Sequence, residues 1–442
     1  MQRVPPYHQE AEQSIIGAVL MNPELINDIS DLISPQDFYR EAHKEIYEAI
    51  TFLYANDQPI DLITITNQLK ERNTLESVGG VTYLTDLMGV VPTLHNVTNY
   101  AEIIRDKSRL RKLIVQANAI TNGAYEGKGV SEIITETEST IDVIMAAGDR
   151  HQLHKASDLI DKVHDKFVYY AENKGKILGI ETGFTDLDKK LIGLQKKDLI
   201  FIAARPSMGK SAFAFNIAQY ASIGQKITTA IFSLEMPEEK VLERMVCSLG
   251  LINHTKARKG EIEDNDWKGI MQSLGCLKAA DLYIDDTTPM KVSEIRSKCR
   301  KIKGLGLVII DHLGFISPEA QNQKNNNINR TQEVGIITKA LKKLAKDLDV
   351  PVILLHQLSR ACEQRANKRP MLSDLRDSGD IEQDADLVMF IYRDEYYNPT
   401  TEKKGFAEII IAKNRDGETG TVELGWIAEH TQFCNLLHAD KG

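Results

Sequence analysis

Hydrophobic side chains in the first 145 residues recur three or four positions apart, as they do on one face of a helix. This spacing predicts helices over residues 10–20, 43–53 and 100–119, and few stretches alternate with the period of two that a strand requires. Turn-forming pairs such as Asn22-Pro23 and Gly79-Gly80 separate the helical stretches. We therefore predict a small all-α domain over residues 1–147.

A polar stretch and a single amphipathic helix follow. Residues 148–155 are expected to form a linker, and residues 157–172 a helix that Asn173-Lys174-Gly175 ends with a left-handed cap. The apolar positions of this helix are Leu159, Ile160, Val163, Phe167 and Tyr170. Such a face either packs on its own chain or docks on a neighbouring subunit, and both alternatives remain open. We assign residues 148–178 to this linker and docking helix.

From residue 179 onward the pattern changes to short apolar runs separated by helical stretches. Strands are predicted at residues 199–204, 228–234, 282–284, 307–310, 350–356, 386–392 and 406–412. Continuous Val, Ile and Leu runs with helices between them are typical of a mostly parallel sheet covered on both faces. Residues 179–442 are therefore predicted to form an α/β domain.

Composition and cysteine usage narrow the class of protein. Of the 442 residues, 42% are hydrophobic and 26% charged, and no run approaches the roughly 18 apolar residues of a membrane helix. The first residues contain no apolar signal segment. The five cysteines are odd in number and far apart, which favours reduced thiols over a disulfide framework or a zinc site. We expect a cytoplasmic protein with no membrane partner.

The net charge of −9 is unevenly distributed. Residues 1–150 contain 12 basic and 22 acidic side chains, whereas residues 151–442 contain 42 and 41. The acidity therefore belongs to the predicted all-α domain. A neutral α/β domain still leaves room for a local basic channel, because the field depends on arrangement rather than on the sum of charges.

The most specific motif lies between a predicted strand and a predicted helix and reads Ala204-Arg205-Pro206-Ser207-Met208-Gly209-Lys210-Ser211. The backbone N–H groups of such a loop and the positive end of the helix bind phosphates. Lys210 is expected to reach the β- and γ-phosphates, and the Ser211 hydroxyl to ligate Mg²⁺. Ala204 replaces the usual first glycine, which is tolerated if its backbone has an ordinary conformation. A chance Gly-Lys-Ser sequence is the alternative.

Polar residues at the ends of other predicted strands complete the candidate site. Asp311 follows four apolar residues and is expected to hold Mg²⁺ through water; capping a helix is the alternative. Glu235 follows the next strand along the chain from the loop and is expected to orient or deprotonate the attacking water; a structural role is the alternative. Gln357 is either a sensor of the γ-phosphate or a surface amide. Arg244, nine residues after Glu235, is a weaker candidate for the nucleotide site.

These motifs, in this order, resemble those of DnaB-type replicative helicases of the RecA-like P-loop class, and the likeness covers essentially the whole chain. The matching segments are Val4-Pro5-Pro6, Glu10-Ala11-Glu12, Gly183-Phe184-Thr185-Asp186-Leu187-Asp188, Ala203 to Ser211, Ser233-Leu234-Glu235-Met236, His356-Gln357-Leu358-Ser359-Arg360, Asp374-Leu375-Arg376-Asp377-Ser378-Gly379, Ile381-Glu382-Gln383-Asp384-Ala385-Asp386 and Ala412-Lys413-Asn414-Arg415. Alanine at position 204 also fits this family.

The resemblance implies a RecA-like ATPase domain preceded by a helical collar, in a homo-hexameric ring that binds ATP and Mg²⁺ at each subunit interface. Lys413 and Arg415 would then reach into the site of the neighbouring subunit; solvated surface residues are the alternative. Arg376, Asp377 and Gly379 would grip the backbone of single-stranded DNA in the channel; an ordinary surface loop is the alternative. The polar residues 321–330 form either a second channel loop or a disordered segment.

The implied function is ATP-driven translocation on one DNA strand, 5′ to 3′, with unwinding of the duplex at the replication fork. Primase and a helicase loader are the implied protein partners, and the docking helix would bind the adjacent subunit. A RecA-like recombinase or a branch-migration ATPase is a rival, although these normally lack the collar. A nucleotide-gated DNA-binding scaffold is a second rival, but such a scaffold needs neither Glu235 nor the Lys413 and Arg415 pair.

Overall fold

The computed structural model describes residues 4–90, 96–130, 133–134, 136–137, 140–141, 144, 155–317, 330–378 and 381–436. The chain divides into two compact units, Met1–Lys166 and Phe167–Gly442, and the division falls inside helix α8 (Ala156–Glu172). Each unit has its own hydrophobic core. Among the described residues, no helix combines the length and the apolar character that crossing a bilayer demands.

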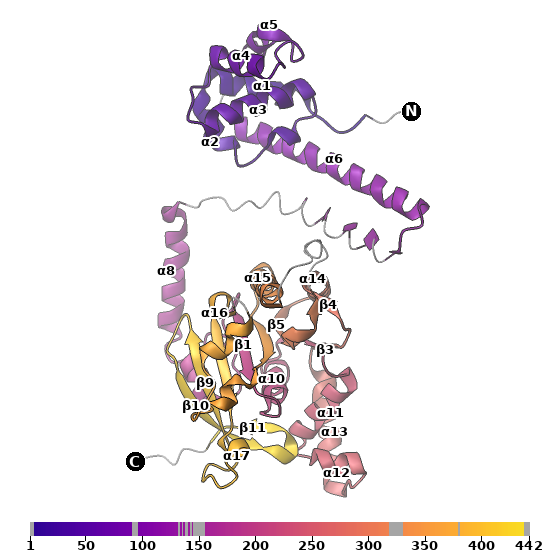
Figure 1. Cartoon of the computed structure of the whole chain (residues 1–442), viewed down its shortest axis with the longest axis vertical. Coiled ribbons are helices and arrows are strands. Elements are labelled where there is room, and N and C mark those ends of the chain that lie inside the picture. The colour runs from indigo at the N-terminus through magenta and orange to yellow at the C-terminus, as the bar shows by residue number, and fades with distance from the viewer. Residues whose placement is uncertain are drawn as a thin grey trace. The chain divides into compact units, whose positions relative to one another are not determined.

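The described part of the N-terminal unit is helical, as its hydrophobic spacing predicts (Figure 1). Its helices are α1 (Gln9–Met21), α2 (Ile26–Ile29), α3 (Glu41–Ala55), α4 (Leu62–Glu71), α5 (Gly80–Gly89) and the long α6 (Val97–Tyr125). A buried polar group links three of them: His43 Nδ1 lies 2.7 Å from Glu12 Oε2, and His43 Nε2 lies 2.8 Å from the Tyr83 hydroxyl. These contacts satisfy polar atoms that would otherwise be costly to bury.

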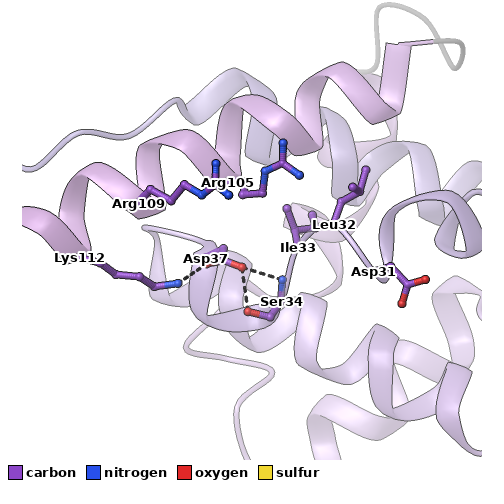
Figure 2. A pocket seen from close by; sticks show the side chains of 8 residues that line it. All are labelled: Asp31, Leu32, Ile33, Ser34, Asp37, Arg105, Arg109 and Lys112. Carbon is purple, nitrogen blue, oxygen red and sulfur yellow. Dashed lines mark hydrogen bonds and ion pairs between the residues drawn. The ribbon is translucent and has the colours of Figure 1, made fainter. Parts of the chain in front are cut away.

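Helix α6 is joined to the rest of this unit through Asp37. The Asp37 carboxylate accepts hydrogen bonds from Ser108 at 2.6 Å, from Lys112 at 2.9 Å and from the Ser34 N–H at 2.9 Å. Burial alone would raise the pKa of Asp37, but these hydrogen bonds outweigh burial and the pKa lies below its ordinary value. Figure 2 shows the pocket beside this contact, where Lys112 and Ser34 point toward Asp37. The charged side chains that line this pocket are therefore partly paired within the chain.

Helix α8 leaves its apolar side exposed. Phe167 is 66% exposed and Ile160 is 61% exposed. The helix is followed by Gly175 with φ +83°, so the left-handed glycine that the sequence predicts is present. An amphipathic helix of this kind gains its stability from a surface that covers its apolar face.

A nine-stranded sheet forms the centre of the C-terminal unit, in the order β11-β10-β9-β8-β1-β7-β5-β2-β3 (Figure 1). The strands are β1 (Leu199–Ala204), β2 (Thr228–Ser233), β3 (Leu282–Asp285), β5 (Leu305–Asp311), β7 (Val352–Gln357), β8 (Leu387–Tyr392), β9 (Phe406–Asn414), β10 (Gly420–Ile427) and β11 (Gln432–Cys434), with a separate pair β4 (Met290–Lys291) and β6 (Ile316–Ser317). The helices are α9 (Thr185–Leu191), α10 (Lys210–Gln219), α11 (Glu238–Leu249), α12 (His254–Lys259), α13 (Asp264–Ala279), α14 (Val292–Lys301), α15 (Arg330–Leu348), α16 (Ile381–Asp384) and α17 (Asp394–Tyr397).

Helices cover both faces of this sheet, as expected for a mostly parallel sheet. Alternate residues of β1 enter two different cores. Ile200 and Ile202 pack with α9, α10 and α11, whereas Leu199 and Phe201 pack with α14 and α15. All six residues of β1 are buried and apolar.

The seven predicted strands are all present, and their limits differ from the predicted ones by at most two residues. Strand β1 lies between the parallel strands β7 and β8, so the loop that follows β1 lies at the middle of the sheet's carboxyl edge. The sequence analysis missed β10 and β11, and the side of the sheet from β8 to β11 is antiparallel. The short α4 and α5 were missed as well.

Candidate functional site

The predicted phosphate loop connects β1 to α10. Ala204 is the last residue of β1 and is buried, and its backbone has no positive φ, so the methyl group is accommodated as expected. Ser207 at φ +66° and Gly209 at φ +97° turn the chain between strand and helix. Such alternation of backbone conformation directs N–H groups into a common concavity, and the start of α10 adds positive partial charge.

Side chains far along the sequence brace this loop. Met208 is buried in the core, and a Cβ on Gly209 would lie 3.0 Å from the Phe433 ring and 3.2 Å from the Trp426 ring. Arg393 donates a hydrogen bond to the Ser207 carbonyl at 3.2 Å. The sequence analysis assigned no role to Arg393, Trp426 or Phe433, and it predicted no strand after residue 412.

Lys210, Ser211 and Asp311 meet at the carboxyl edge of the sheet. The Ser211 hydroxyl donates to Asp311 Oδ2 at 2.5 Å, and Lys210 Nζ lies 3.4 Å from Asp311 Oδ1. Asp311 is fully buried, and its Oδ1 accepts no hydrogen bond from the residues that the structure describes. A buried carboxylate beside a hydroxyl, with spare acceptor capacity, suits a hard divalent cation such as Mg²⁺. The donor set therefore fits the ion that the sequence predicts.

Glu235 extends this cluster on the other side of Asp311. Strand β2 is separated from β1 by β7 and β5, yet Glu235 Oε2 lies 3.2 Å from Nδ1 of His312, the residue after Asp311. Oxygen and nitrogen atoms of Glu235, Asp311 and His312 all lie within 4.8 Å of one another. Burial lowers the pKa of His312, and the Lys210 charge lowers it further against the opposing effect of Glu235. His312 is a residue that the sequence analysis missed, although it directly follows the apolar run before Asp311.

Three further candidates lie around the loop. Gln357 is exposed at the end of β7, level with Ala204 in the neighbouring strand. The Arg205 guanidinium turns away from the loop, because it donates to Glu363 at 2.9 Å and to the Leu358 carbonyl at 2.7 Å. Arg244 is half-buried on α11, and its contact with a nucleotide stays a prediction.

Lys413 and Arg415 lie at the opposite edge of the sheet. Strand β9 runs antiparallel to β8, so its end lies beside the start of β8, where Asn414 pairs with Leu387. Lys413 Nζ donates to the carbonyls of Glu382 and Ala385 at 2.6 and 2.7 Å. The Arg415 side chain is 68% exposed. The structure thus brings Lys210, Ser211, Asp311, Glu235 and Gln357 to one edge and does not bring Lys413 and Arg415 to them.

The predicted DNA contacts lie largely outside the described residues. Gly379 is not among them, and neither are residues 318–329, which include most of the predicted second loop. For Arg376 and Asp377 only the backbone is described, in the 3₁₀-helix η8 (Leu372–Ser378). The five cysteines, in contrast, are all described and all free, as expected.

Comparison with known proteins now gives this arrangement a family. The model of the DnaB-like helicase C terminal domain matches residues 179–435, and that of the DnaB-like helicase N terminal domain matches residues 4–106. The chain belongs to the DnaB-like helicase family. It is 44% identical over 438 residues to "Replicative DNA helicase DnaC" of Bacillus subtilis, covering 98% of this chain and 96% of that protein. It is 43% identical to "Replicative DNA helicase DnaB" of Geobacillus stearothermophilus, with the same coverage of both chains.

Similar solved structures agree with this family. "The Structure Of A DnaB-Like Replicative Helicase And Its Interactions With Primase" is similar over 97% of this chain and 100% of that chain, at 34% identity and a TM-score of 0.78. A second solved structure, of an ATPase domain alone, is 40% identical, covers 63% of this chain and 99% of that chain, and has a TM-score of 0.59. The protein is therefore a replicative DNA helicase and an ATP-dependent enzyme, which excludes the recombinase and the scaffold as its class.

Proposed function

We propose that this helicase works as a ring of six identical subunits around single-stranded DNA, with ATP bound where two subunits meet. The observation that carries the proposal is the separation of Arg415 from the phosphate loop within one chain. The backbone of Arg415 bonds to that of Asp386, level with the first residue of β1, whereas the loop follows the last residue of the strand. At about 3.3 Å per residue, six residues separate the two edges by roughly 17 Å. A head-to-tail ring brings the amino edge of one subunit to the carboxyl edge of the next.

Within each site, residues of one chain bind the phosphates and activate water. Lys210 and the N–H groups of the loop hold the β- and γ-phosphates, and the Ser211 hydroxyl and the Asp311 carboxylate hold Mg²⁺. The ion neutralises charge on the phosphate oxygens when it is bound. Glu235 takes up the proton of the attacking water, and its 3.2 Å contact with His312 supports that position. Gln357 contacts the γ-phosphate from the end of the adjacent strand.

The neighbouring subunit supplies the remaining positive charge. Arg415 and Lys413 stabilise the charge that develops on the γ-phosphate, and an arginine supplied in this way accelerates analogous enzymes by about 10³–10⁵. Hydrolysis then depends on how two subunits face each other, which couples the reaction to movement between them.

Exposed apolar faces support this assembly. The apolar side of α8 is exposed, as described above, and we assign residues 148–178 to a linker whose helix docks on the adjacent subunit. Leu110, Leu113, Ile114 and Val115 form an exposed apolar stretch on α6, which suits pairing of the N-terminal collars, residues 1–147. Primase is named with the similar solved helicase, and we propose primase and a helicase loader as partners here.

Arg376, Asp377 and Gly379 are proposed to hold the DNA backbone inside the ring. Arginine pairs with phosphate, and glycine lets a backbone N–H approach closely, so the grip is independent of sequence. The acidic collar does not compete for DNA. Translocation is proposed to run 5′ to 3′, by resemblance to the family.

Mixing two inactive variants tests the shared site. Lys210→Ala lacks a working phosphate loop but keeps Arg415, whereas Arg415→Ala has the reverse defect. Each alone is expected to lose ATP hydrolysis. Mixed subunits place an intact loop opposite an intact arginine at about one interface in four, so activity returns. No gain on mixing would contradict a site that is shared between subunits.

Strand displacement on forked DNA tests direction. Forks that carry only a 5′ tail or only a 3′ tail are incubated with and without ATP. We expect unwinding that needs ATP and a 5′ tail for loading. Unwinding from a 3′ tail alone would overturn the proposed polarity.

A further inference from the structure

Asp386 is a buried acid at the amino edge of the sheet, beside Arg415. Its side chain is only 5% exposed, and its Oδ2 accepts the Leu199 N–H at 2.8 Å and a hydrogen bond from Lys342. Its Oδ1 lies 3.3 Å from Arg415 Nη1. One carboxylate therefore joins the start of β1, the helix α15 and the end of β9.

The two cations beside Asp386 do not contact it equally. Lys342 is 17% exposed and makes the tighter contact with Asp386, whereas Arg415 is 68% exposed and makes the longer one. Lys342 thus compensates the buried carboxylate. The guanidinium uses one of its five N–H groups for Asp386. Among the residues that the structure describes, the other N–H groups of this side chain make no hydrogen bond, so they are available to phosphate oxygens.

Asp386 is also the point at which neighbouring segments converge. Thr338 of α15 donates to Asp384 Oδ2 at 2.6 Å, and Lys413 caps the carbonyls of Glu382 and Ala385. Residues 381–386 are therefore fixed by α15 on one side and by the end of β9 on the other. A side chain held there has a defined direction before any neighbour arrives, and a preorganised cation loses less freedom on contact.

We propose that Asp386 is the positioning residue for Arg415, and that it directs the guanidinium toward the phosphates of the next subunit. This inference rests on the proposed function, in which Arg415 acts across the interface. Asp386 touches no nucleotide. It acts through Arg415, and Lys342 keeps the carboxylate from neutralising the arginine that it holds.

The first test is Asp386→Asn in the full chain. We expect kcat for ATP to fall about 10- to 100-fold, the effect of misplacing a catalytic group, while KM and nucleotide affinity stay unchanged. Lys342→Gln should show the same loss in kcat alone, because Asp386 then neutralises Arg415, and it serves if the first variant does not fold. Asp264→Asn, the same change at an exposed acid on α13, is the matched control and should behave as the parent. Normal kcat in both test variants would overturn the inference.

The second test separates this inference from the proposed function. Asp386→Asn is mixed with Lys210→Ala, in parallel with the mixture of Arg415→Ala and Lys210→Ala. If both mixtures regain ATP hydrolysis, Asp386 acts through the arginine that it presents to its neighbour. If only the Arg415 mixture regains activity, the site is shared but Asp386 serves its own chain, and the inference is wrong. If neither does, the shared site itself is wrong.

Discussion

The two edges of the central sheet hold the two groups of residues that we propose to form one catalytic site. The carboxyl edge holds Lys210, Asp311 and Glu235 close together, with Asp311 fully buried. The amino edge holds Arg415 with most of its side chain exposed. The first edge is organised inward, around a site that its own chain builds. The amino edge exposes its cation, and we propose that a neighbouring subunit meets it there.

Together with the proposed function, this difference implies that a chain can complete its fold without containing a complete catalytic site. All strands of the sheet come from one chain, yet Lys413 and Arg415 of that chain lie at the opposite edge from Lys210. On the proposal of a shared site, a subunit folds by itself but needs a neighbour for catalysis. Four variants test the contrast, in order of decreasing expected effect.

Lys210→Ala should have the largest effect, because it removes the cation that lies 3.4 Å from buried Asp311 and that is proposed to hold the phosphates. We expect ATP hydrolysis to fall by about 10³-fold or more, measured as phosphate release with and without single-stranded DNA. Lys189→Ala, an exposed lysine on α9, is the control and should leave the rate unchanged. A parental rate in Lys210→Ala would move the site away from the carboxyl edge.

Glu235→Gln should come next. The amide keeps the shape of the side chain but no longer accepts the proton of water, so turnover should fall about 10²- to 10⁴-fold. Nucleotide affinity, measured with a fluorescent ATP analogue, should be retained. Glu239→Gln on the exposed part of α11 provides the matched control. Equal turnover in Glu235→Gln and the parent would assign the base to another residue.

Arg376→Ala probes the segment that leads into β8 at the amino edge. Loss of one charged contact with phosphate should weaken single-strand binding roughly tenfold and reduce the slope of log K against log salt by about 1. The effect should be the same for all DNA sequences, measured by fluorescence anisotropy. Arg258→Ala on α12 is the control. Unchanged affinity of Arg376→Ala would place the DNA contact elsewhere.

Asp198→Asn should have the smallest effect and acts on stability at the amino edge. Burial, and then repulsion by Asp386, raise the pKa of Asp198 from 3.8 to about 6. Folding therefore favours the protonated acid, and ionisation destabilises the folded state as pH rises through this range. With allowance for partial exposure, the asparagine variant should be more stable by about 1 kcal/mol at pH 7.5.

The measurement for Asp198→Asn is urea unfolding followed by tryptophan fluorescence, since Trp267 and Trp426 both belong to the C-terminal unit. The gain in stability should vanish near pH 4, because Asp198 of the parent is then protonated and, like asparagine, carries no charge. A gain in stability that does not change with pH would show that packing, and not charge, is its cause.

The sequence predicts the parallel part of this fold well, because buried parallel strands are continuous apolar runs. Strand β1 occurs at the predicted residues, since no polar side chain interrupts it. Strand β10 (Gly420–Ile427) was missed because it alternates buried and exposed positions and contains glycines. The N-terminal unit was predicted as helical from spacing alone, although the short α4 and α5 were too brief to be recognised.

Candidate site residues that follow an apolar run could be predicted from the sequence. The position of Lys413 and Arg415 could not, because it depends on the direction of strand β9. The loop from Ala204 to Ser211 and the acid Asp311 each follow an apolar run, which local spacing reveals. Local spacing does not reveal that β9 runs antiparallel to β8. A parallel β9 would have brought Lys413 and Arg415 to their own phosphate loop, and the 13 residues between β8 and β9 permit either course. His312 escaped notice because a single histidine carries little signal without its contact to Glu235.

The bracing of Gly209 by Trp426 and Phe433 has a consequence for biosynthesis. Strands β10 and β11 leave the ribosome more than 200 residues after the loop that they support. A growing chain can form the inner strands of the sheet before Phe433, whose ring lies next to Gly209, has been synthesised. The loop therefore gains this packing only after the last strands of the sheet have been synthesised, and a chain terminated before Trp426 lacks it.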